Sequence, residues 1–598
     1  MRVAIAQFAT SLNSQENLST CIRMINEAAE CKPDLIVLPE FCNTQFCNIQ
    51  PGYIDHQQAW NEALSIEGAF LCSIAEQAKR HNCYLVLGIT LRRDLSRDGL
   101  NNTQDDSIKS NISVTSCLFS PSEGLIHQED KQTLIGYESK FFTSAGKISG
   151  VVKTTFGKFG LLTGSDGISF EASRELVSQG AQILCHSLSS CALDQSSLHG
   201  PARACENKVF FAVANKVGLL IPQKPDSQEE DEILSSHCVI PDEYLVGVGQ
   251  SQIVSPDGKV LAKITNNKEG FAFADINLEE CDANKKQFRP DGTDFIKQRR
   301  PELYQGPILS INQALQQEEG SRVPITANAA IFATYKSNEQ AIEDVCHYIE
   351  NNLSDIIQLP ELFFIADKSV TNNAKQREQI ACLSKQLINQ VSSVLRPFQY
   401  VCTSLVIDGA HQAVIISEHG LFATQQQLHF CQRYQWTALG DDLNIIELPL
   451  EQGNINLAML TADDANMPEI VKLAASSGIH VLLVPFDIQE ACEVEYNLLS
   501  RATENRICIV AASREKSFVD VLSAVDVKTN NKKKIKPQKS TGLIVSLTTE
   551  SVLLNSWKSR KFDGYINQPL VKHQHGKITK AVIHPAATCN KLIGFKYL

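Results

Sequence analysis

The run GKFGLLTGSDGISFEASRELVSQGAQILCHS, residues 157–187, decides the fold class of this chain. An apolar, strand-like run (157–167) precedes a helix-like run, EASRELVSQG (171–180), and a second apolar run, AQILCHS (181–187), follows it. Short continuous apolar runs separated by helical segments are typical of strands that helices bury on both faces. This alternation continues outward in both directions, so we expect an α/β protein in which helices cover a sheet.

The N-terminal segment fits the same alternation. MRVAIAQFATSLN (1–13) indicates a first strand, and NLSTCIRMINEAAECK (17–32) indicates a helix with Ile22, Ile25 and Ala29 on one face. The apolar stretch at the start is too short and too early for a signal peptide, and no later run reaches transmembrane length. We therefore expect a cytoplasmic protein.

The composition indicates a globular chain with an acidic balance. The 598 residues are 43% hydrophobic and 20% charged, which is enough apolar material for a core. Lys and Arg number 55 against 67 Asp and Glu, a net charge of −12. This charge argues against a nucleic-acid backbone or an anionic membrane as the main partner.

The cysteines favour a reducing compartment and no metal centre. Nineteen are spread from Cys21 to Cys589, without a C-x-x-C pair or a Cys/His cluster at zinc spacing. Scattered thiols with mostly apolar neighbours are typical of free, buried cysteines in the cytosol. We expect no structural metal and no cofactor.

The chain repeats itself at the scale of a domain. DLIVLPEF (34–41) recurs as DIIQLPELF (355–363), residues 165–187 recur as 463–485, and residues 202–216 recur as 500–514. Asp166 and Asp464, Glu171 and Glu469, and Arg203 and Arg501 are each 298 residues apart. Matches that share one offset indicate two copies of one domain, which we place at residues 1–285 and 325–598.

Two segments are predicted to lie outside these domains. KKQFRPDGTDFIKQRRPELYQGP (285–307) is charged and carries three prolines, which favours an interdomain linker over residues 286–324. KTNNKKKIKPQKS (528–540) is basic and poor in apolar residues, and we interpret it as a solvated loop, with a nucleic-acid contact as the minor reading.

The order and spacing of several motifs resemble the nitrilase, or carbon–nitrogen hydrolase, superfamily. They are VAIAQF (3–8), DLIVLPEF (34–41), the Lys131 segment, GYESKFFTSAG (136–146), FGKFGLLTGSDG (156–167) and ARACENKVFFAVANKVG (202–218), followed by the strand pair SQIVSPDGKVLAKI (251–264). The first half looks most like the branch that acts on N-carbamoyl amines such as N-carbamoylputrescine. The resemblance extends more weakly over residues 325–598.

The resemblance implies a Glu–Lys–Cys triad, of which two members have counterparts here. In the family the cysteine forms an acyl-enzyme, the glutamate is the base, and the lysine stabilises the tetrahedral oxyanion. Glu40 matches the glutamate, and Lys131 in HQEDKQTL (127–134) matches the lysine. The position of Glu40 in the sequence independently favours a functional role, because a carboxylate just past the end of a buried strand lies where open α/β folds bind ligands.

The nucleophilic cysteine is missing from the first domain. Asp166 and Glu171 fix the register, so the nucleophile position is Gly164, which has no side chain. The adjacent Ser165 would point to the opposite face of a strand. TGSDG also fails the G-x-S-x-G elbow, because Thr163 stands at the first glycine.

Two nearby positions are candidates for compensating these losses. A supporting glutamate of the family falls on Ser139, with Glu138 beside it, so that carboxylate is predicted to be lost or displaced by one. Cys185 is followed by His186, but adjacent strand residues face opposite ways, so a relocated Cys–His nucleophile is disfavoured.

The second domain matches the triad less well. Glu361 falls on the base, Gln427 in QQQLHF (425–430) on the lysine, and Ala462 on the nucleophile. Gln427 has no charge for an oxyanion and Ala462 cannot attack a carbonyl. One of three triad members is therefore predicted to survive there.

Two functions remain open from the sequence. The first is a catalytically impaired tandem member of the family that acts as a binding or scaffold protein, with a small amide or N-carbamoyl compound as a possible ligand. The second is an active C–N hydrolase in which Glu40 activates water and Lys131 stabilises the oxyanion. Loss of a covalent nucleophile costs several powers of ten in rate, which favours the first.

The resemblance also implies a four-layer α-β-β-α sandwich for each domain and a mode of pairing. Family subunits pair through two helices, which map to Glu171–Gly180 and Pro201–Lys208, and to Glu469–Ser477 and Ser500–Arg506. We therefore expect an intramolecular pseudo-dimer, since tethered copies have a high effective concentration for one another. The competing picture is two copies that each pair with another chain.

Overall fold

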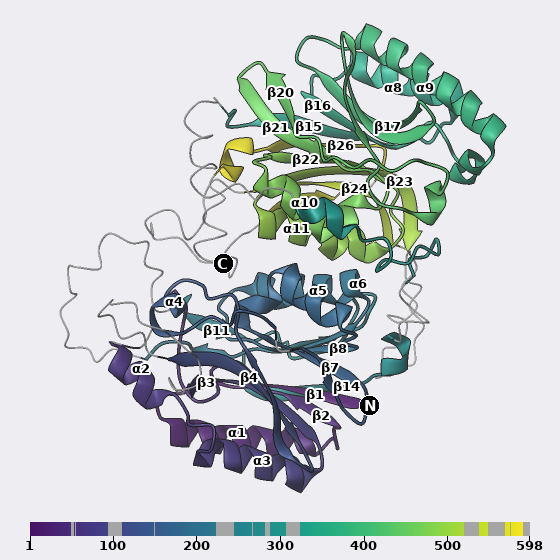
Figure 1. Ribbon diagram of the computed structural model, residues 1–598. Coiled ribbons are helices and arrows are strands. Elements are labelled where there is room, and N and C mark those ends of the chain that lie inside the picture. The colour runs from purple at the N-terminus through teal and green to yellow at the C-terminus, as the bar shows by residue number, and fades with distance from the viewer. Residues whose placement is uncertain are drawn as a thin grey trace, which may run out of the picture. The chain divides into compact units, whose positions relative to one another are not determined.

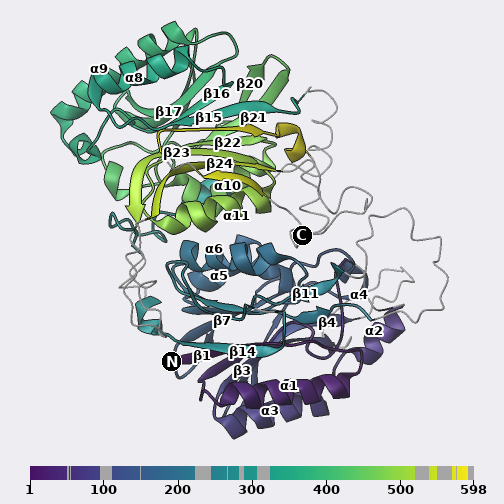
Figure 2. The ribbon, with the colours of Figure 1, turned by 180° about the vertical axis from the view of Figure 1, so that it is seen from behind.

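The chain folds as two compact units, which Figures 1 and 2 show from opposite sides. The computed structural model describes all residues except 50–52, 54, 94–110, 149, 223–243, 266, 282–287, 306–322, 519–537, 548–568, 574–575 and 590–598. The described residues of the first unit lie within Met1–Gln287, and those of the second within Phe288–Thr549 and Gln568–Leu592.

The first unit contains two six-stranded sheets. One has the order β14 (Gly270–Asp275), β1 (Arg2–Gln7), β2 (Leu35–Val37), β3 (Tyr84–Arg92), β4 (Ile112–Ser120) and β5 (Gly124–Asp130). The other has the order β13 (Val260–Lys263), β12 (Gln252–Val254), β9 (Phe210–Ala214), β8 (Ile183–Ser187), β7 (Lys158–Thr163) and β6 (Val152–Lys153). β1, β2 and β3 are parallel, as are β7, β8 and β9, so their carboxyl ends can gather functional groups.

Helices cover the outer face of each sheet of the first unit (Figure 1). The helices α1 (Ser14–Ala29) and α3 (Ala69–His81) lie on one side, and α5 (Phe170–Ser178) and α6 (Gly200–Asn207) on the other. Alternate residues of β1 face different layers: Ala4 and Ala6 belong to the helix-side core, whereas Val3 and Ile5 belong to the core between the sheets. This arrangement is the expected α-β-β-α sandwich.

The buried face of α1 differs from the predicted one by part of a turn. Its buried apolar residues are Leu18, Cys21, Met24, Ile25 and Ala28. Ile25 is buried as expected, but Ile22 and Ala29 are only half-buried. The prediction is confirmed for Ile25 and displaced for Ile22 and Ala29, because the buried face follows Leu18, Cys21 and Met24 at i, i+3 spacing and then Ala28, four residues after Met24.

The second unit repeats this architecture. One sheet has the order β26 (Ile578–Ile583), β15 (Ala327–Phe332), β16 (Ile356–Glu361), β17 (Tyr400–Ile407), β18 (Ala410–Ser417) and β19 (Gly420–Gln426). The other has the order β20 (Ile446–Leu450), β21 (Gly453–Met459), β22 (Val481–Pro485), β23 (Cys508–Phe518), β24 (Gln538–Leu547) and β25 (Pro569–His573). Its helices are α8 (Asn338–Glu350), α9 (Ala374–Val394), α10 (Pro468–Ser476) and α11 (Leu498–Asn505). Each half is therefore an α/β unit with paired six-stranded sheets, as predicted.

One pair of aspartates marks the equivalence of the two units. The carboxylate of Asp166 accepts hydrogen bonds from the backbone N–H groups of Gln132 and Thr133, at 3.0 and 2.8 Å. The carboxylate of Asp464 accepts from the N–H groups of Leu428 and His429, at 2.9 and 2.7 Å. The offset between the two aspartates, read from sequence, thus corresponds to the same structural position.

The segment predicted as a linker is partly built into the second unit. Residues 288–305, which we call the strap, belong to that unit and include a 3-10 turn at Pro301–Gln305. Residues 306–322 lie outside the described residues, and so does most of the basic segment 528–540, of which the last three residues begin β24. The boundaries 1–285 and 325–598 stay predictions.

None of the helices in the described part of the chain combines the length and apolar character that a membrane crossing requires.

Candidate active site

Glu40 lies in the first unit just past the carboxyl end of β2. Its backbone N–H donates to the carbonyl of Leu188, which follows β8, so the loop is tied to the second sheet. The next residue, Phe41, has a φ of +53°, and this left-handed conformation turns the chain away from the direction of the strand. The Glu40 residue is 1% exposed, so its carboxylate needs partners inside the protein.

Lys131 supplies the first of these partners. It follows β5, is 1% exposed, and its Nζ lies 3.0 Å from Oε1 of Glu40. The structure thus brings together two candidate residues that are 91 positions apart in the sequence. A carboxylate and an ammonium in contact stabilise each other's charged forms.

Glu138 is the supporting carboxylate, and it was not lost. Its Oε1 lies 2.6 Å from Nζ of Lys131, and its Oε2 accepts from the backbone N–H of Ile135 at 2.9 Å. Glu138 begins the short helix α4 (Glu138–Phe141), which turns its side chain inward, while the hydroxyl of Ser139 donates to the carbonyl of Gly136. Of the two alternatives, displacement by one residue is the one that the structure bears out.

Gly164 occupies the centre of this cluster. It has a φ of +50° and starts a 3-10 turn, Gly164–Gly167, directly after β7. A Cβ at this position would lie 2.3 Å from Nζ of Lys131 and 2.4 and 2.8 Å from the carboxylate oxygens of Glu40. The side chains of Lys131 and Glu40 therefore converge on the one residue that cannot present a side chain.

The neighbouring candidates do not replace the missing side chain. Ser165 lies in the turn and not on a strand, so the reason given for its orientation was wrong, but its hydroxyl donates away from the cluster, to the carbonyl of Thr133. Cys185 belongs to the core between the sheets, and burial raises the pKa of its thiol. His186 faces the other way and its Nε2 lies 2.7 Å from the carbonyl oxygen of Gly164.

Burial dominates the electrostatics of the cluster. It raises the pKa of Glu40 to about 7, although Lys131 opposes the shift. Burial alone would lower the pKa of Lys131, but the carboxylates of Glu138 and Glu40 hold it above its ordinary value. Burial also lowers the pKa of His186 to about 4, so its ring is neutral at physiological pH.

The second unit keeps the backbone of this site while its side chains differ. Glu361 ends β16 and is fully buried, and its backbone N–H donates to the carbonyl of Phe486 as that of Glu40 does to Leu188. Ala462 has a φ of +53°, close to that of Gly164, and its N–H donates to Oε2 of Glu361 at 3.0 Å. The left-handed turn after the strand is thus present without a nucleophile.

Gln427 occupies the place of Lys131. Its backbone N–H donates to the carbonyl of His411, and its backbone carbonyl accepts from the N–H of Gly440. Lys131 makes the same two backbone hydrogen bonds, to the carbonyl of Val114 and from the N–H of Ala145. The Gln427 amide donates to the carbonyl of His429 at 2.7 Å and its Oε1 lies 2.9 Å from Nδ1 of His411. No hydrogen bond of this amide reaches Glu361 in the part of the unit that the structure describes.

Tyr434 is the residue that sequence reasoning missed. Its hydroxyl donates to Oε1 of Glu361 at 2.6 Å, and it lies 73 residues further along the chain. Its backbone N–H donates to the carbonyl of Cys431, three residues earlier, as that of Glu138 does to Ile135. Tyr434 therefore occupies the position that Glu138 occupies in the first unit. It follows Gln427 by the same number of residues as Glu138 follows Lys131, and this spacing would have identified it.

The strap adds a second charged cluster beside Ala462. Nη1 of Arg289 lies 2.9 Å from Oε1 of Glu493, and its Nε lies 3.5 Å from Oδ2 of Asp463. Arg433 pairs at 2.8 Å with Oδ2 of Asp291 on the strap and at 2.8 Å with Oδ1 of Asp463. Ligand atoms of Asp291, Cys431 and Asp463 lie within 4.8 Å of one another, but the two guanidinium groups already neutralise these carboxylates, which disfavours a metal ion.

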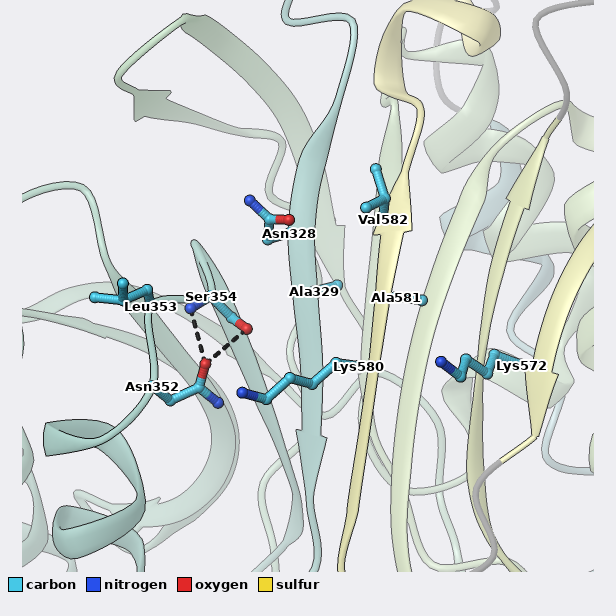
Figure 3. A pocket seen from close by; sticks show the side chains of 9 residues that line it. All are labelled: Asn328, Ala329, Asn352, Leu353, Ser354, Lys572, Lys580, Ala581 and Val582. Carbon is cyan, nitrogen blue, oxygen red and sulfur yellow. Dashed lines mark hydrogen bonds between the residues drawn. The ribbon is translucent and has the colours of Figure 1, made fainter.

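Figure 3 shows a hollow of about 510 Å³ at the edge formed by β15 and β26 of the second unit. Asn352 accepts two 3.0 Å hydrogen bonds from Ser354, and Lys580 lines the same hollow (Figure 3). Leu353 is 77% exposed, and neither Glu361 nor Ala462 lines this hollow. We therefore do not assign the triad chemistry to it.

Comparison with known sequences supports the reading of the first half. The carbon–nitrogen hydrolase family matches residues 2–286. A nitrilase from Pyrococcus abyssi is 26% identical over 295 residues, which cover 49% of this chain and 94% of that protein. An omega-amidase from Xenopus tropicalis is 26% identical over 321 residues, which cover 51% of this chain and 96% of that protein.

The solved structures that are similar to this chain include an amidase from Nesterenkonia sp. AN1, in which acrylamide has added to the active-site cysteine. It covers 51% of this chain and 98% of its own, with 21% identity and a TM-score of 0.38. A cysteine-to-alanine variant of that amidase in complex with butyramide covers 51% of this chain and 95% of its own, with 21% identity and a TM-score of 0.37. On the sequence match, the first half of this chain, residues 2–286, is a carbon–nitrogen hydrolase domain of the nitrilase superfamily.

Proposed function

We propose that this chain is a catalytically impaired relative of the carbon–nitrogen hydrolases that binds a ligand or a partner without forming an acyl-enzyme. The observation that carries the proposal is Gly164, where a Cβ would lie 2.3 Å from Nζ of Lys131 and 2.4 Å from Oε1 of Glu40. The base and the oxyanion donor are in contact at a position with no nucleophile. Without a thiol, the covalent half of the family's reaction has no attacking atom.

The second unit supports the same proposal. Glu361 is held by Tyr434 and by the N–H of Ala462, while Gln427 supplies no positive charge. An oxyanion there would lack an attacking group and a cation at the position of Lys131. The ammonium of Lys368 lies 3.5 Å from Oε1 of Glu361 and pairs with Asp487 at 3.2 Å. We infer that the second unit has no hydrolytic role.

For the first unit we propose a small amide or N-carbamoyl compound as the ligand class. Glu40 and Lys131 offer an acceptor and a donor, which complement the N–H and carbonyl groups of an amide or urea. The relatives include a nitrilase and an omega-amidase. The N-carbamoyl branch, suggested by motif spacing, is the finer form of the same proposal.

A second candidate function is hydrolysis without a thiol. Burial raises the pKa of Glu40 to about 7, which suits a general base near neutral pH. Glu40 would take a proton from water, the water oxygen would attack the amide carbon, and Lys131 would stabilise the oxyanion. Glu40 would then give this proton to the leaving nitrogen as the C–N bond breaks, which releases ammonia or an amine and a carboxylic acid. Two carboxylates already hold the Lys131 ammonium, and water would have to enter this cluster, so we favour binding.

Four forms of the full chain test these functions: wild type, Glu40→Gln, Gly164→Cys and Gly164→Ala. Short amides and N-carbamoyl amines serve as substrates, and ammonia release and intact-protein mass are measured. We expect the wild type to turn over no faster than Glu40→Gln. We expect Gly164→Cys to gain a thiol that iodoacetamide labels at position 164, and Gly164→Ala controls for the added Cβ. Wild-type turnover that Glu40→Gln abolishes would establish the second function instead.

A further inference from the structure

The second unit contains a cavity of about 600 Å³ next to the place of its former triad. It opens past the carboxyl ends of β16 and β22, where parallel strands of α/β folds present ligand-binding groups. Three basic side chains line it, Lys368, Arg433 and Arg514, and acidic side chains lie among them. Buried Glu361 does not line the cavity itself, but Lys368, which does, has its Nζ 3.5 Å from Oε1 of Glu361, so the cavity adjoins the triad position.

Two of the three cations are already neutralised. Nζ of Lys368 lies 3.2 Å from Oδ1 of Asp487 and 3.5 Å from Oε1 of Glu361. Arg433 pairs with Asp291 and Asp463, each at 2.8 Å. Both basic side chains are only 10% exposed, and these contacts hold them in the wall of the cavity.

Arg514 is different, because its guanidinium contacts carbonyl groups and no carboxylate among the described residues. Its Nε donates to the carbonyl of Phe363 at 3.0 Å, and its Nη2 donates to the carbonyls of Phe363 and Lys336. The side chain is half-buried, and desolvation lowers its pKa although Asp487 acts in the opposite direction. A desolvated, uncompensated guanidinium in a cavity wall is a binding group for a carboxylate.

Asp367 is an exposed carboxylate among the residues that line the cavity. Its carboxylate accepts the backbone N–H of Ser369 at 3.0 Å, and no cation pairs with it among the described residues. Hydrogen bonding to the side chain and then to the backbone N–H of Ser369 lowers the pKa of Asp367, so the group is ionised at neutral pH. Arg514 and Asp367 are thus two unpaired charges of opposite sign on one cavity.

We propose that this cavity binds a small zwitterion of amino-acid size, with its carboxylate on Arg514 and its ammonium on Asp367. A ligand without a carboxylate would leave the half-buried guanidinium of Arg514 desolvated and unpaired, and the exposed carboxylate of Asp367 adds attraction for an ammonium. The volume accommodates a free amino acid or a short ω-amino acid. The inference goes beyond the proposed function, because it uses no residue of the first unit.

The test is a calorimetric titration of the full chain with the twenty amino acids and with ω-amino acids of three to six carbons. For the tightest ligand, two analogues follow, one lacking the ammonium and one lacking the carboxylate. We expect binding below 1 mM for at least one zwitterion, and about 10- to 100-fold weaker binding of each analogue. Absence of any such ligand, or an analogue that binds as tightly, would overturn the proposal.

Variants locate the binding. Arg514→Gln and Asp367→Asn are expected to weaken it by about 10- to 100-fold, and Arg514→Lys to retain part of it. Arg396→Gln is the matched control, because Arg396 also donates to backbone carbonyls of the second unit, those of Asn352 and Glu350, but does not line the cavity. Binding that survives both charge-removing variants would belong elsewhere in the chain and would refute this site.

Discussion

The hydroxyl of Tyr434 donates a 2.6 Å hydrogen bond to Oε1 of Glu361 in the second unit. In the first unit the equivalent carboxylate, Glu40, is held by the ammonium of Lys131 instead. In the second unit a neutral hydroxyl and the N–H of Ala462 are the nearest donors to this buried carboxylate, and the ammonium of Lys368 lies further away, 3.5 Å from Oε1. Since buried carboxylates need such partners, we expect these hydrogen bonds to contribute to the stability of the second unit.

We expect Tyr434→Phe to destabilise the second unit by about 1–3 kcal/mol, because the fully buried Glu361 loses a donor. Tyr400→Phe is the control, since its hydroxyl donates to the neutral carbonyl of Pro449 at 2.9 Å and its loss costs about 1 kcal/mol. Urea denaturation with hydrogen exchange assigns the loss to a unit. Equal losses for both variants would contradict the role given to Tyr434.

We expect Gly164→Ala to destabilise the first unit by about 1–3 kcal/mol. The added Cβ enters the Lys131–Glu40 contact and the residue must keep a φ of +50°. Gly124→Ala separates the two causes, because Gly124 has a φ of +73° but its Cβ would meet nothing closer than Ala75 at 3.6 Å. A loss at Gly164 no larger than at Gly124, measured by thermal unfolding, would mean that the cluster is not packed around Gly164.

The stability of the first unit should depend on pH through Glu40. Burial raises the folded pKa of this carboxyl to about 7, so its contribution is fully present below the unfolded pKa and is lost as pH rises towards 7. Glu40→Gln cannot ionise, so its stability relative to wild type should increase between pH 5 and pH 8, by about 1.4 kcal/mol per unit of pKa shift. Denaturation curves at each pH measure this, and exposed Glu76→Gln should run parallel to wild type. A Glu40→Gln curve that also runs parallel would refute the shift.

We expect Arg289→Met to destabilise the second unit by about 3–5 kcal/mol, because Glu493 loses its cation inside the protein. Burial already raises the pKa of Glu493 to about 7, so lowering the pH should protonate it and restore part of the loss. Lys297→Met removes a strap pair whose lysine is 84% exposed and should change stability by less than about 1 kcal/mol. Similar effects of the two variants would show that the strap is peripheral.

The pseudo-dimer stays a prediction from the sequence. A protease site inserted within residues 306–322, followed by cleavage and size exclusion at micromolar concentration, tests it. Two halves that elute together would support an interdomain interface, since the covalent tether would no longer hold them. Halves that separate at once would favour two copies that pair with other chains.

Motifs recovered the fold and the contact of Glu40 with Lys131, because strand ends and loop lengths fix where such residues meet. They did not recover Tyr434, whose position is defined by a backbone turn and not by a residue type. They also gave no sign of the ion pair between Arg289 and Glu493, which are 204 positions apart. A charged, proline-containing run has the composition of a linker, and the sequence does not show the distant residues with which its charges pair. The packing of the strap against the second unit was therefore not predicted.

The strap has a practical consequence for anyone who separates the two halves. A fragment that begins at residue 325 would leave out Arg289, Gln298 and Arg300, and with them the partners of Asp463, Glu493 and the Gly440 carbonyl. In such a fragment, buried carboxylates would lose their partners or become exposed to solvent. We expect the fragment to aggregate because its fold would be destabilised. A fragment of the second half should therefore begin at Phe288, where the second unit begins. The residues that connect the two halves in sequence are thus part of the fold of the second half.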